Sequence, residues 1–258
     1  MMRRAAAAAI LAMMLIVALL LRGESFVDVS ERLLPPSSMH LMGTDTFGRD
    51  VASRIGTGIL VSASIAAAAS SIALAAGLAL SFFFSVWRMP GPVFLTAILT
   101  LKTVPPVLLA LFLSAISGPG VIKLAAVLAI GHAADIAETA YSRVLVARSE
   151  DYTLSAIGLG KGRVDVYLHH ILPAIMPYIA KQAVSIFSAS ILSEASLSFL
   201  GCGVPVTIPT LGSMLSEARP VMGQAPWLVA FPALFLFLIG LSLELLASGR
   251  SELDPSSH

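Results

Sequence analysis

Six long apolar segments constrain what this chain can fold into. They lie at about residues 5–21, 59–87, 93–116, 122–141, 175–200 and 227–246. A helix needs about 20 mostly apolar residues to cross the hydrocarbon core of a bilayer, and each segment comes near that length. Backbone polar groups inside a membrane must bond to one another, so such segments are expected to be helical. The sequence predicts an all-α, polytopic membrane protein with about six transmembrane helices.

The composition supports this class. Hydrophobic residues make up 57% of the chain and charged residues 12%, and the mean hydropathy is +0.90, which is too apolar for an ordinary soluble domain. The formal net charge of +1 gives no overall attraction to nucleic acid. The apolar composition makes the lipid bilayer the expected surrounding. The single cysteine, Cys202, excludes an internal disulfide and a cysteine-rich metal site.

The chain divides at its first apolar segment. Arg3 and Arg4 precede that segment as in a signal peptide, but no small-x-small cleavage site follows it. We expect an uncleaved anchor helix over 1–22, an outer-side loop over 23–58 and a transmembrane domain over 59–248, with a cytoplasmic tail over 249–258. Pro105 and Pro106 remove two backbone donors within the third segment and predict a kink or break there.

The distribution of Lys and Arg predicts the orientation. Arg88 and the basic residues of 143–163 fall in loops on one side, whereas the short turn 117–120 on the other side holds no charge. The positive-inside rule places the basic loops in the cytoplasm. Both termini and the polar stretch 150–173 are then expected on the cytoplasmic side.

The stretch 155–173, SAIGLGKGRVDVYLHHILP, suggests a nucleotide-binding loop at first sight. A P-loop requires glycine where this chain has Ser155, and a hydroxyl residue where it has Gly162. The dinucleotide pattern fails as well, because Arg163 stands where the third glycine belongs. We therefore expect this chain to bind no nucleotide.

Helical periodicity explains the same stretch better. Four residues follow the spacing i, i+3, i+4 and i+7: Tyr152, Ser155, Ala156 and Leu159. Gly160 is expected to end this helix, and the pattern resumes at Arg163 until Pro173. The sequence thus predicts two short helices joined by a glycine turn, with small residues that allow close approach to a partner.

Several ordered motifs carry a resemblance to a known family. They are Asp151-Tyr152-x-x-Ser155-Ala156-x-x-Leu159-Gly160, then His169-His170-Ile171-Leu172-Pro173, with GTDTFGRD at 43–50, LSEASLSFLGCG at 192–203, QAPW at 224–227 and LDP at 253–255. Together they resemble the ABC importer permeases of the dipeptide/oligopeptide/nickel class, in its second-permease branch. In that family, a loop like 150–173 is the EAA loop, whose coupling helix docks on the ATPase.

The resemblance implies the fold of a type I ABC importer permease and a transport subunit without chemistry of its own. It implies import of peptides, nickel or metal-chelating small molecules across the bacterial inner membrane. The implied partners are a second homologous permease, two ATP-binding cassette subunits and an extracytoplasmic substrate-binding protein. ATP and magnesium would bind to the ATPase subunits, so no catalytic residue, cofactor or metal is expected here. The implied docking residues are Asp151, Tyr152, Ser155, Ala156, Leu159, Gly160, Lys161, Leu172 and Pro173.

The chain departs from the family pattern at two instructive places. Leu154 stands where the EAA motif has its glutamate, and Ser155 where it has its first alanine. Glu138 stands where the family tends to carry an arginine at the end of the fourth span. An acid at that depth is expected to need another role or a partner.

The predicted spans contain several ionisable residues, and four of them stand out: His132, Asp135, Glu138 and Glu194. Such groups are costly in a bilayer and usually face the bundle interior or a water-filled path. They are candidates for the translocation pathway, and pairing between helices is the alternative. An ion-coupled secondary transporter that uses Asp135, Glu138 or Glu194 as a relay is a competing function.

Two further patterns suggest metal sites but favour structural roles. His169 and His170 point about 100° apart if they are helical, and no cysteine or carboxylate cluster accompanies them. Asp45 and Asp50 lack the other donors of a calcium loop, so helix capping or bonding between loops is expected.

Overall fold

The computed structural model describes residues 2–21, 23, 26–87, 90–205 and 207–248, and these are almost entirely helical. The α-helices are α1 (Met2–Leu21), α2 (Val51–Val86), α3 (Gly91–Lys102), α4 (Pro106–Ser117), α5 (Val121–Ser149), α6 (Asp151–Gly158), α7 (Arg163–Val166), α8 (Leu172–Phe199), α9 (Leu211–Ala218) and α10 (Trp227–Ser248). Shorter turns are η1 (Val29–Glu31), the π-helical η2 (Tyr167–Ile171) and η3 (Arg219–Val221). The predicted tail 249–258, with the LDP motif at 253–255, lies outside the described residues.

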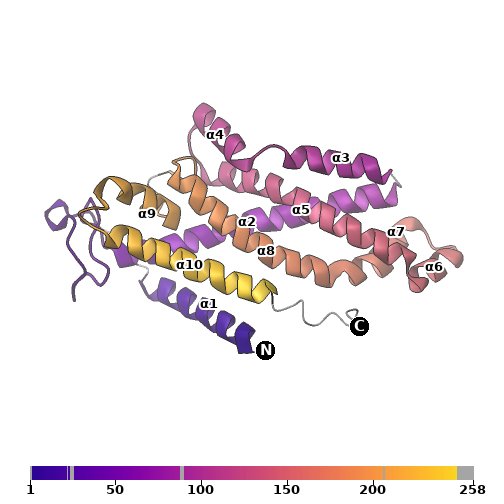
Figure 1. Ribbon diagram of the computed structural model, residues 1–258, viewed down its shortest axis with the longest axis horizontal. Coiled ribbons are helices and arrows are strands. Elements are labelled where there is room, and N and C mark those ends of the chain that lie inside the picture. The colour runs from indigo at the N-terminus through magenta and orange to yellow at the C-terminus, as the bar shows by residue number, and fades with distance from the viewer. Residues whose placement is uncertain (1, 22, 24–25, 88–89, 206, 249–258) are drawn as a thin grey trace.

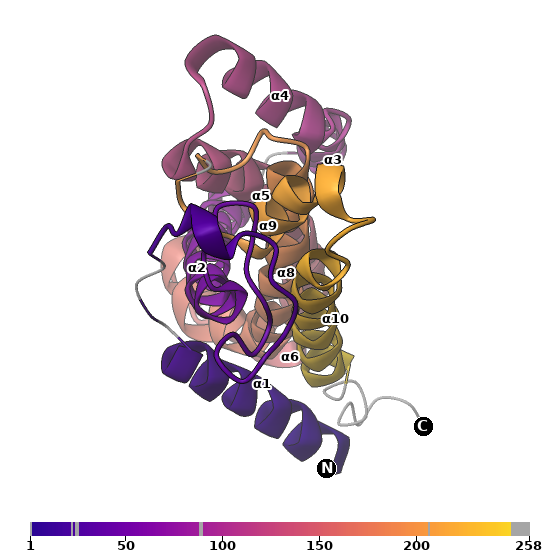
Figure 2. The same cartoon turned by 90° about the vertical axis from the view of Figure 1, so that its left-hand side faces the viewer.

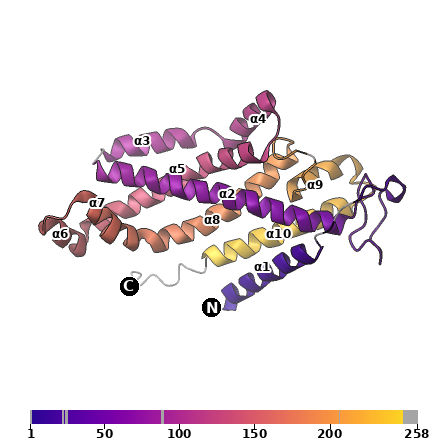
Figure 3. The ribbon, with the colours of Figure 1, turned by 180° about the vertical axis from the view of Figure 1, so that it is seen from behind.

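Three long helices form the middle of the molecule. Helices α2, α5 and α8 run along its long axis and pack against one another (Figure 1). Helices α1 and α10 pack together on one side, and α3 and α4 contact α5 on the other, as the end view in Figure 2 shows. Helices α6 and α7 lie at one end of the bundle, and α9 with the loop 26–50 lies at the opposite end (Figure 3).

Small residues explain why α2 and α5 lie so close together. Ala66, Ala69, Ala73 and Gly77 are all buried on one face of α2. A Cβ atom at Gly77 would lie 2.5 Å from the Cβ atom of Ile136 on α5. A stripe of small residues lets two helix backbones approach, as is common within membranes.

Length and composition support several membrane spans. Among the described residues, three helices are long and apolar enough to cross a bilayer: Val51–Val86, Arg163–Phe199 and Trp227–Ala247. The pair Gly91–Lys102 and Val107–Ser117 satisfies the same criteria together but is bent by 57°. Ala8–Leu21 is a shorter apolar helix, and α5 is 29 residues long but includes several charged side chains. All six predicted segments are helical, and the third is bent at Pro105 as predicted.

Two predicted helix boundaries are wrong. The second span begins at Val51 instead of about residue 59, because the Asp50 side chain accepts a hydrogen bond from the Ser53 amide at 2.8 Å and caps the helix earlier. The helix predicted to end at Pro173 continues through η2 into α8. The wider π-helical turn before Pro173 accommodates its ring and missing N–H without a break.

Candidate functional site

The glycine turn after α6 has the predicted geometry. Gly160 has a φ of +80°, a left-handed conformation that favours glycine. The Gly160 amide donates to the Ile157 carbonyl at 2.9 Å, and the Lys161 amide donates to the Ala156 carbonyl at 3.2 Å. These bonds satisfy carbonyls at the end of α6 and turn the chain towards α7.

One residue of the predicted face of α6 points inward. Thr153 and Ala156 are buried against the rest of the chain, and the Thr153 hydroxyl donates to the Ala147 carbonyl at 2.7 Å. The outward face carries large apolar side chains: Tyr152, Leu154, Ile157 and Leu159. Ala156 therefore packs within this chain, and the surface open to a partner is apolar. Leu154, which replaces the glutamate of the EAA motif, is part of that surface.

Most of the other residues of the predicted docking loop are open to solvent. Asp151, Ser155, Gly160, Lys161 and Pro173 are exposed. Leu172 packs partly against a buried cluster formed by α5, α6 and α8.

His169 contacts a carboxylate one turn away. The His169 Nδ1 atom lies 2.8 Å from the Asp165 Oδ1 atom, and the Lys161 ammonium lies 3.8 Å from Asp165 Oδ2. No group of three or more His, Cys, Asp or Glu side chains in the described part of the chain is placed to hold a metal ion. These contacts link α7 to the helix that follows it.

Two arginines connect this loop to the end of α2. The Arg148 guanidinium donates to the Ser85 carbonyl, and the Arg163 guanidinium donates to the Val86 carbonyl at 3.5 Å. Cations at a helix C-terminus satisfy its free carbonyls and interact favourably with its dipole. The loop that contains α6 is thereby joined to both α5 and α2.

Four ionisable residues meet midway along the bundle and form what we name the Lys102 cluster: Lys102, His132, Asp135 and Glu138. The Lys102 ammonium lies 2.9 Å from Asp135 Oδ1 and 2.8 Å from Glu138 Oε2. His132 Nδ1 lies 3.7 Å from Asp135 Oδ2. Glu138 thus has the partner that the sequence required.

A cavity of about 190 Å³ adjoins this cluster. Its lining comes from α3, from the bend that follows it, from α5 and from α8: Leu101, Lys102, Val104, Leu128, Gly131, His132, Asp135 and Ser193. Irregular backbone at membrane depth is tolerated where it lines a cavity or is buried in protein. The bend that precedes Pro105 is therefore next to a cavity lined by Lys102, His132 and Asp135.

Glu194 occupies a different environment. It is fully buried, and its carboxylate accepts hydrogen bonds from the hydroxyls of Ser62 on α2 and Ser198 on α8, each at 2.7 Å. Its neighbour Ser193 lines the cavity, whereas Glu194 contacts α2. The structure brings together His132, Asp135 and Glu138 and places Glu194 in the contact between two helices.

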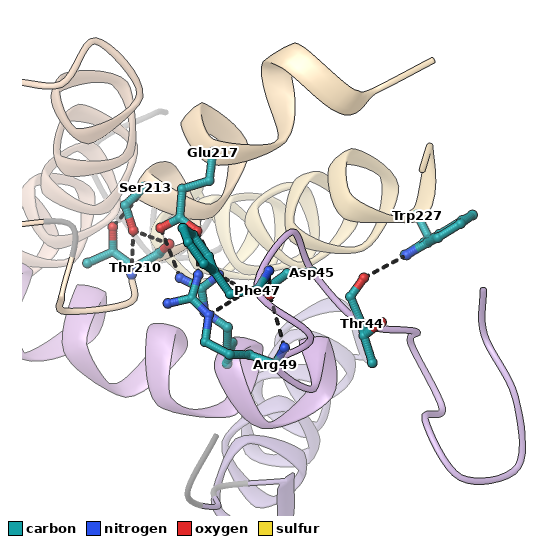
Figure 4. A network of polar contacts seen from close by, with 9 residues as sticks. Thr44, Asp45, Phe47, Arg49, Thr210, Ser213, Glu217 and Trp227 are labelled. Atoms are coloured by element: carbon teal, nitrogen blue, oxygen red, sulfur yellow. Dashed lines mark hydrogen bonds and ion pairs between the residues drawn. The ribbon is translucent and has the colours of Figure 1, made fainter. Parts of the chain in front are cut away.

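A second charged network lies at the α9 end of the bundle (Figure 4). Asp45 Oδ1 accepts from the amides of Phe47 and Arg49, at 2.8 and 3.0 Å. Asp45 Oδ2 accepts from the guanidinium groups of Arg49 and Arg54, each at 2.6 Å. Both arginines also contact Glu217 of α9. The prediction that Asp45 and Asp50 cap helices and join loops is confirmed.

Residues distant in sequence complete this end. The Trp227 indole donates to the Thr44 carbonyl at 3.4 Å (Figure 4). A capping box between Thr210 and Ser213 begins α9 and so positions Glu217. Sequence reasoning did not single out Glu217, because no local pattern links it to arginines more than 160 residues away.

Comparisons with known proteins identify relatives over most of the chain. Residues 72–248 match the family described as "Binding-protein-dependent transport system inner membrane component". The dipeptide transport system permease protein DppC of Alkalihalophilus pseudofirmus is 33% identical over 242 residues, which cover 92% of this chain and 80% of the relative. The glutathione transport system permease protein GsiD of Escherichia coli O6:K15:H31 is 33% identical over 240 residues, covering 90% and 77%.

Solved structures share the fold at low sequence identity. A chain of the MetNI methionine ABC transporter in an inward-facing conformation superimposes with a TM-score of 0.57 at 15% identity, covering 75% of this chain and 94% of that one. A chain of an amino acid ABC transporter crystallised with histidines gives a TM-score of 0.58 at 18% identity, covering 76% and 92%. The arrangement of helices is therefore one already seen in solved ABC transporters.

Proposed function

Because the chain belongs to the family of binding-protein-dependent transport system inner membrane components, we propose that it forms half of the translocation pathway of a peptide importer. It is a multi-pass permease subunit of an ABC importer in the inner membrane, without catalysis or cofactors of its own, and ATP is bound by partner ATPase subunits. The observation that carries the proposed pathway is the charged cavity beside the bent α3–α4 pair, midway along the bundle.

The names of the relatives support peptides as the substrate class. DppC is a dipeptide permease and GsiD a glutathione permease, and each matches at least 90% of this chain. The sequence motifs alone also allowed nickel and metal chelates. We propose a small peptide because dipeptides and glutathione share its chemistry, with amide bonds and charged end groups.

The outward face of α6 is the proposed contact with an ATPase subunit. Leu154 and Leu159 are exposed on it at 52% and 82%, which is costly for leucines unless a partner covers them. An apolar groove on the partner would compensate for the missing glutamate of the EAA motif. Docking through apolar side chains also explains why Ala156 faces inward.

The link from α6 to the pathway runs through the end of α2. Arg163 and Arg148 bind the last carbonyls of that helix, and α2 packs along α5, which carries the Lys102 cluster. Movement of a docked loop is thereby passed to the helices that line the cavity. The permease alternates between two conformational states. ATP binding shifts the equilibrium between them only because the ATP-bound ATPase subunits have a different affinity for each state.

The proposed complex contains a second homologous permease, two ATP-binding cassette subunits and an extracytoplasmic binding protein. The second permease would cover the partly exposed side chains of the Lys102 cluster and close the pathway. In the proposed orientation both termini and the loop 150–173 are cytoplasmic. A topology reporter inserted beside Lys161 is expected to score as cytoplasmic, and an outside signal would invert this orientation.

Cysteine cross-linking tests the docking surface directly. The native Cys202 is buried, so a Leu159→Cys variant places a reactive thiol on the tip of α6. A matched control is Ile122→Cys, which is equally exposed at 85% but lies at the start of α5. We expect ATPase cross-links from position 159 and none from position 122. Equal cross-linking from both positions, or none from position 159 in the assembled complex, would contradict the docking proposal.

A further inference from the structure

The Lys102 cluster holds more negative than positive charge. The Lys102 ammonium is shared between the carboxylates of Asp135 and Glu138. The ring of His132 lies beside Asp135 and adds no charge when it is neutral. The formal sum is therefore −1, with Lys102 counted as +1 and Asp135 and Glu138 as −1 each. A carboxylate at membrane depth is stabilised by a nearby cation, so this group can accept one more positive charge.

Of the two carboxylates, the one that lines the cavity is that of Asp135. It does so together with His132 and Lys102, whereas the partly exposed Glu138 lies outside the lining that the described residues form. Its volume of about 190 Å³ has room for about six water molecules at about 30 Å³ each. Ligand pockets usually measure about 300–1,000 Å³, so this chain accommodates the end group of a ligand instead of the whole molecule.

Lys102 is placed to exchange between its partners. It is the last residue of α3, directly before the bend, and its flexible side chain is 37% exposed. Its ammonium lies almost equally far from Asp135 and Glu138. When Lys102 withdraws from Asp135, it keeps a full ion pair with Glu138, and Asp135 is left facing the cavity without a cation.

We propose that Asp135 binds the α-ammonium group of a peptide during its passage, while Lys102 remains paired with Glu138. This inference rests on the proposed function, since it assigns the recognised chemical group of that substrate class. In the ligand-bound state each carboxylate has one cation, so neither carboxylate is left unpaired. The incoming ammonium brings three donors, for which the oxygens of Asp135 and the ring of His132 are available.

The assembled permease–ATPase complex, without its binding protein, allows a direct test. Ligand-observed NMR titrations measure the affinity for dialanine and for N-acetyl-dialanine, which lacks the ammonium. Loss of a charge-assisted hydrogen bond weakens binding by about tenfold or more, so the acetylated probe is expected to bind at least that much more weakly. Equal affinities for the two probes would overturn the inference.

Two variants are expected to differ in their effect on dialanine binding. Asp135→Asn should lower the affinity for dialanine to that for the acetylated probe. Lys102→Met removes the competing cation, so dialanine should bind at least as tightly as to the natural complex. Glu244→Gln, an acid-to-amide change at an exposed position of α10, is the matched control and should leave both affinities unchanged. Weaker binding of both probes to both cluster variants would mean that the ion pairs only hold helices together, and would overturn the inference.

A further variant decides the case if the Lys102→Met complex cannot be recovered. Glu138→Gln leaves Asp135 as the only carboxylate for Lys102, so dialanine should bind several-fold more weakly while the acetylated probe is unaffected; an unchanged affinity for dialanine would overturn the inference. ATP-driven uptake of dialanine by the complete importer distinguishes failure of the proposed function from failure of this inference alone. Absence of such uptake overturns the proposed function and this inference together, whereas uptake with equal binding of both probes overturns this inference alone.

Discussion

The guanidinium of Arg54 on α2 binds the carboxylate of Glu217 on α9 at two points, with N–O distances of 2.8 and 3.0 Å. Arg54 is buried, and Asp45 contacts the same guanidinium from the loop before α2. With Arg49 the network contains two cations and two anions, so its formal charges balance. The loop before α2, the start of α2 and the distant helix α9 are thereby fixed together at one end of the bundle.

Removing one member of this network should be costly. Glu217→Ala leaves Arg54 with Asp45 alone, and loss of one partner of a buried pair costs about 3 kcal/mol in the free energy of unfolding. The double variant Arg54→Met/Glu217→Leu leaves no buried charge unpaired at these positions and should be less destabilised than the two single changes together. Unfolding in detergent measures all the variants, and strictly additive effects would contradict the coupling.

Close packing of α2 on α5 depends on Gly77. A methyl group there would lie 2.5 Å from the Ile136 Cβ atom and 2.8 Å from the Ala133 carbonyl oxygen, closer than atoms can approach. Gly77→Ala should therefore lower the free energy of unfolding by about 1–3 kcal/mol through overpacking. Gly240→Ala is the control, because its new methyl would meet Leu192 at an ordinary 3.8 Å. Equal thermal midpoints for the two variants would contradict the close packing of α2 on α5 at Gly77.

The turn after α6 should tolerate substitution at one glycine and not at the other. Gly160→Ala forces a side chain into a left-handed conformation at φ +80°, at a cost of about 1 kcal/mol. Gly158→Ala has open space around it and strengthens the end of α6. We expect lower coupling of ATP hydrolysis to uptake in the first variant and normal coupling in the second. Normal coupling in both variants would show that docking does not depend on the conformation of this turn.

His40 makes the loop before α2 sensitive to pH. Hydrogen bonds to Asp50 and then to Glu31, at 3.1 and 3.2 Å, raise the pKa of His40 above its usual 6.5 although burial opposes them. The stabilisation is thus complete below about pH 6.5 and is lost as the pH rises through the higher folded-state pKa. Thermal midpoints of the natural protein and of His40→Gln should differ more at about pH 5.5 than at about pH 8.5. A larger difference at the higher pH would have the wrong sign.

Local signals predicted the helices and their interruptions. Apolar length identified the segments, Pro105 marked the bend of the α3–α4 pair, and Gly160 ended α6. Each of these features follows from a few neighbouring residues. The start of α2 was missed because the prediction followed the apolar segment, which begins at about residue 59. The helix itself begins eight residues earlier, where Asp50 caps it.

Contacts between distant residues were beyond sequence reasoning. Periodicity placed Ala156 on the same face of α6 as Tyr152 and Leu159, yet Ala156 is buried and the other two are exposed. Glu138 was expected to need a partner, yet only the fold shows that Lys102 serves both it and Asp135. Glu194 satisfied the rule for a pathway residue, and only the fold shows its hydrogen bond with Ser62, which joins α8 to α2.

Peptide uptake into proteoliposomes that contain the complete importer tests the central claim most directly. With ATP available to the ATPase subunits, the account predicts uptake that stops when ATP is withheld and continues when a protonophore collapses the proton gradient. Uptake that persists without the ATPase subunits and ceases with the gradient would contradict the account and favour an ion-coupled transporter that uses Asp135, Glu138 or Glu194.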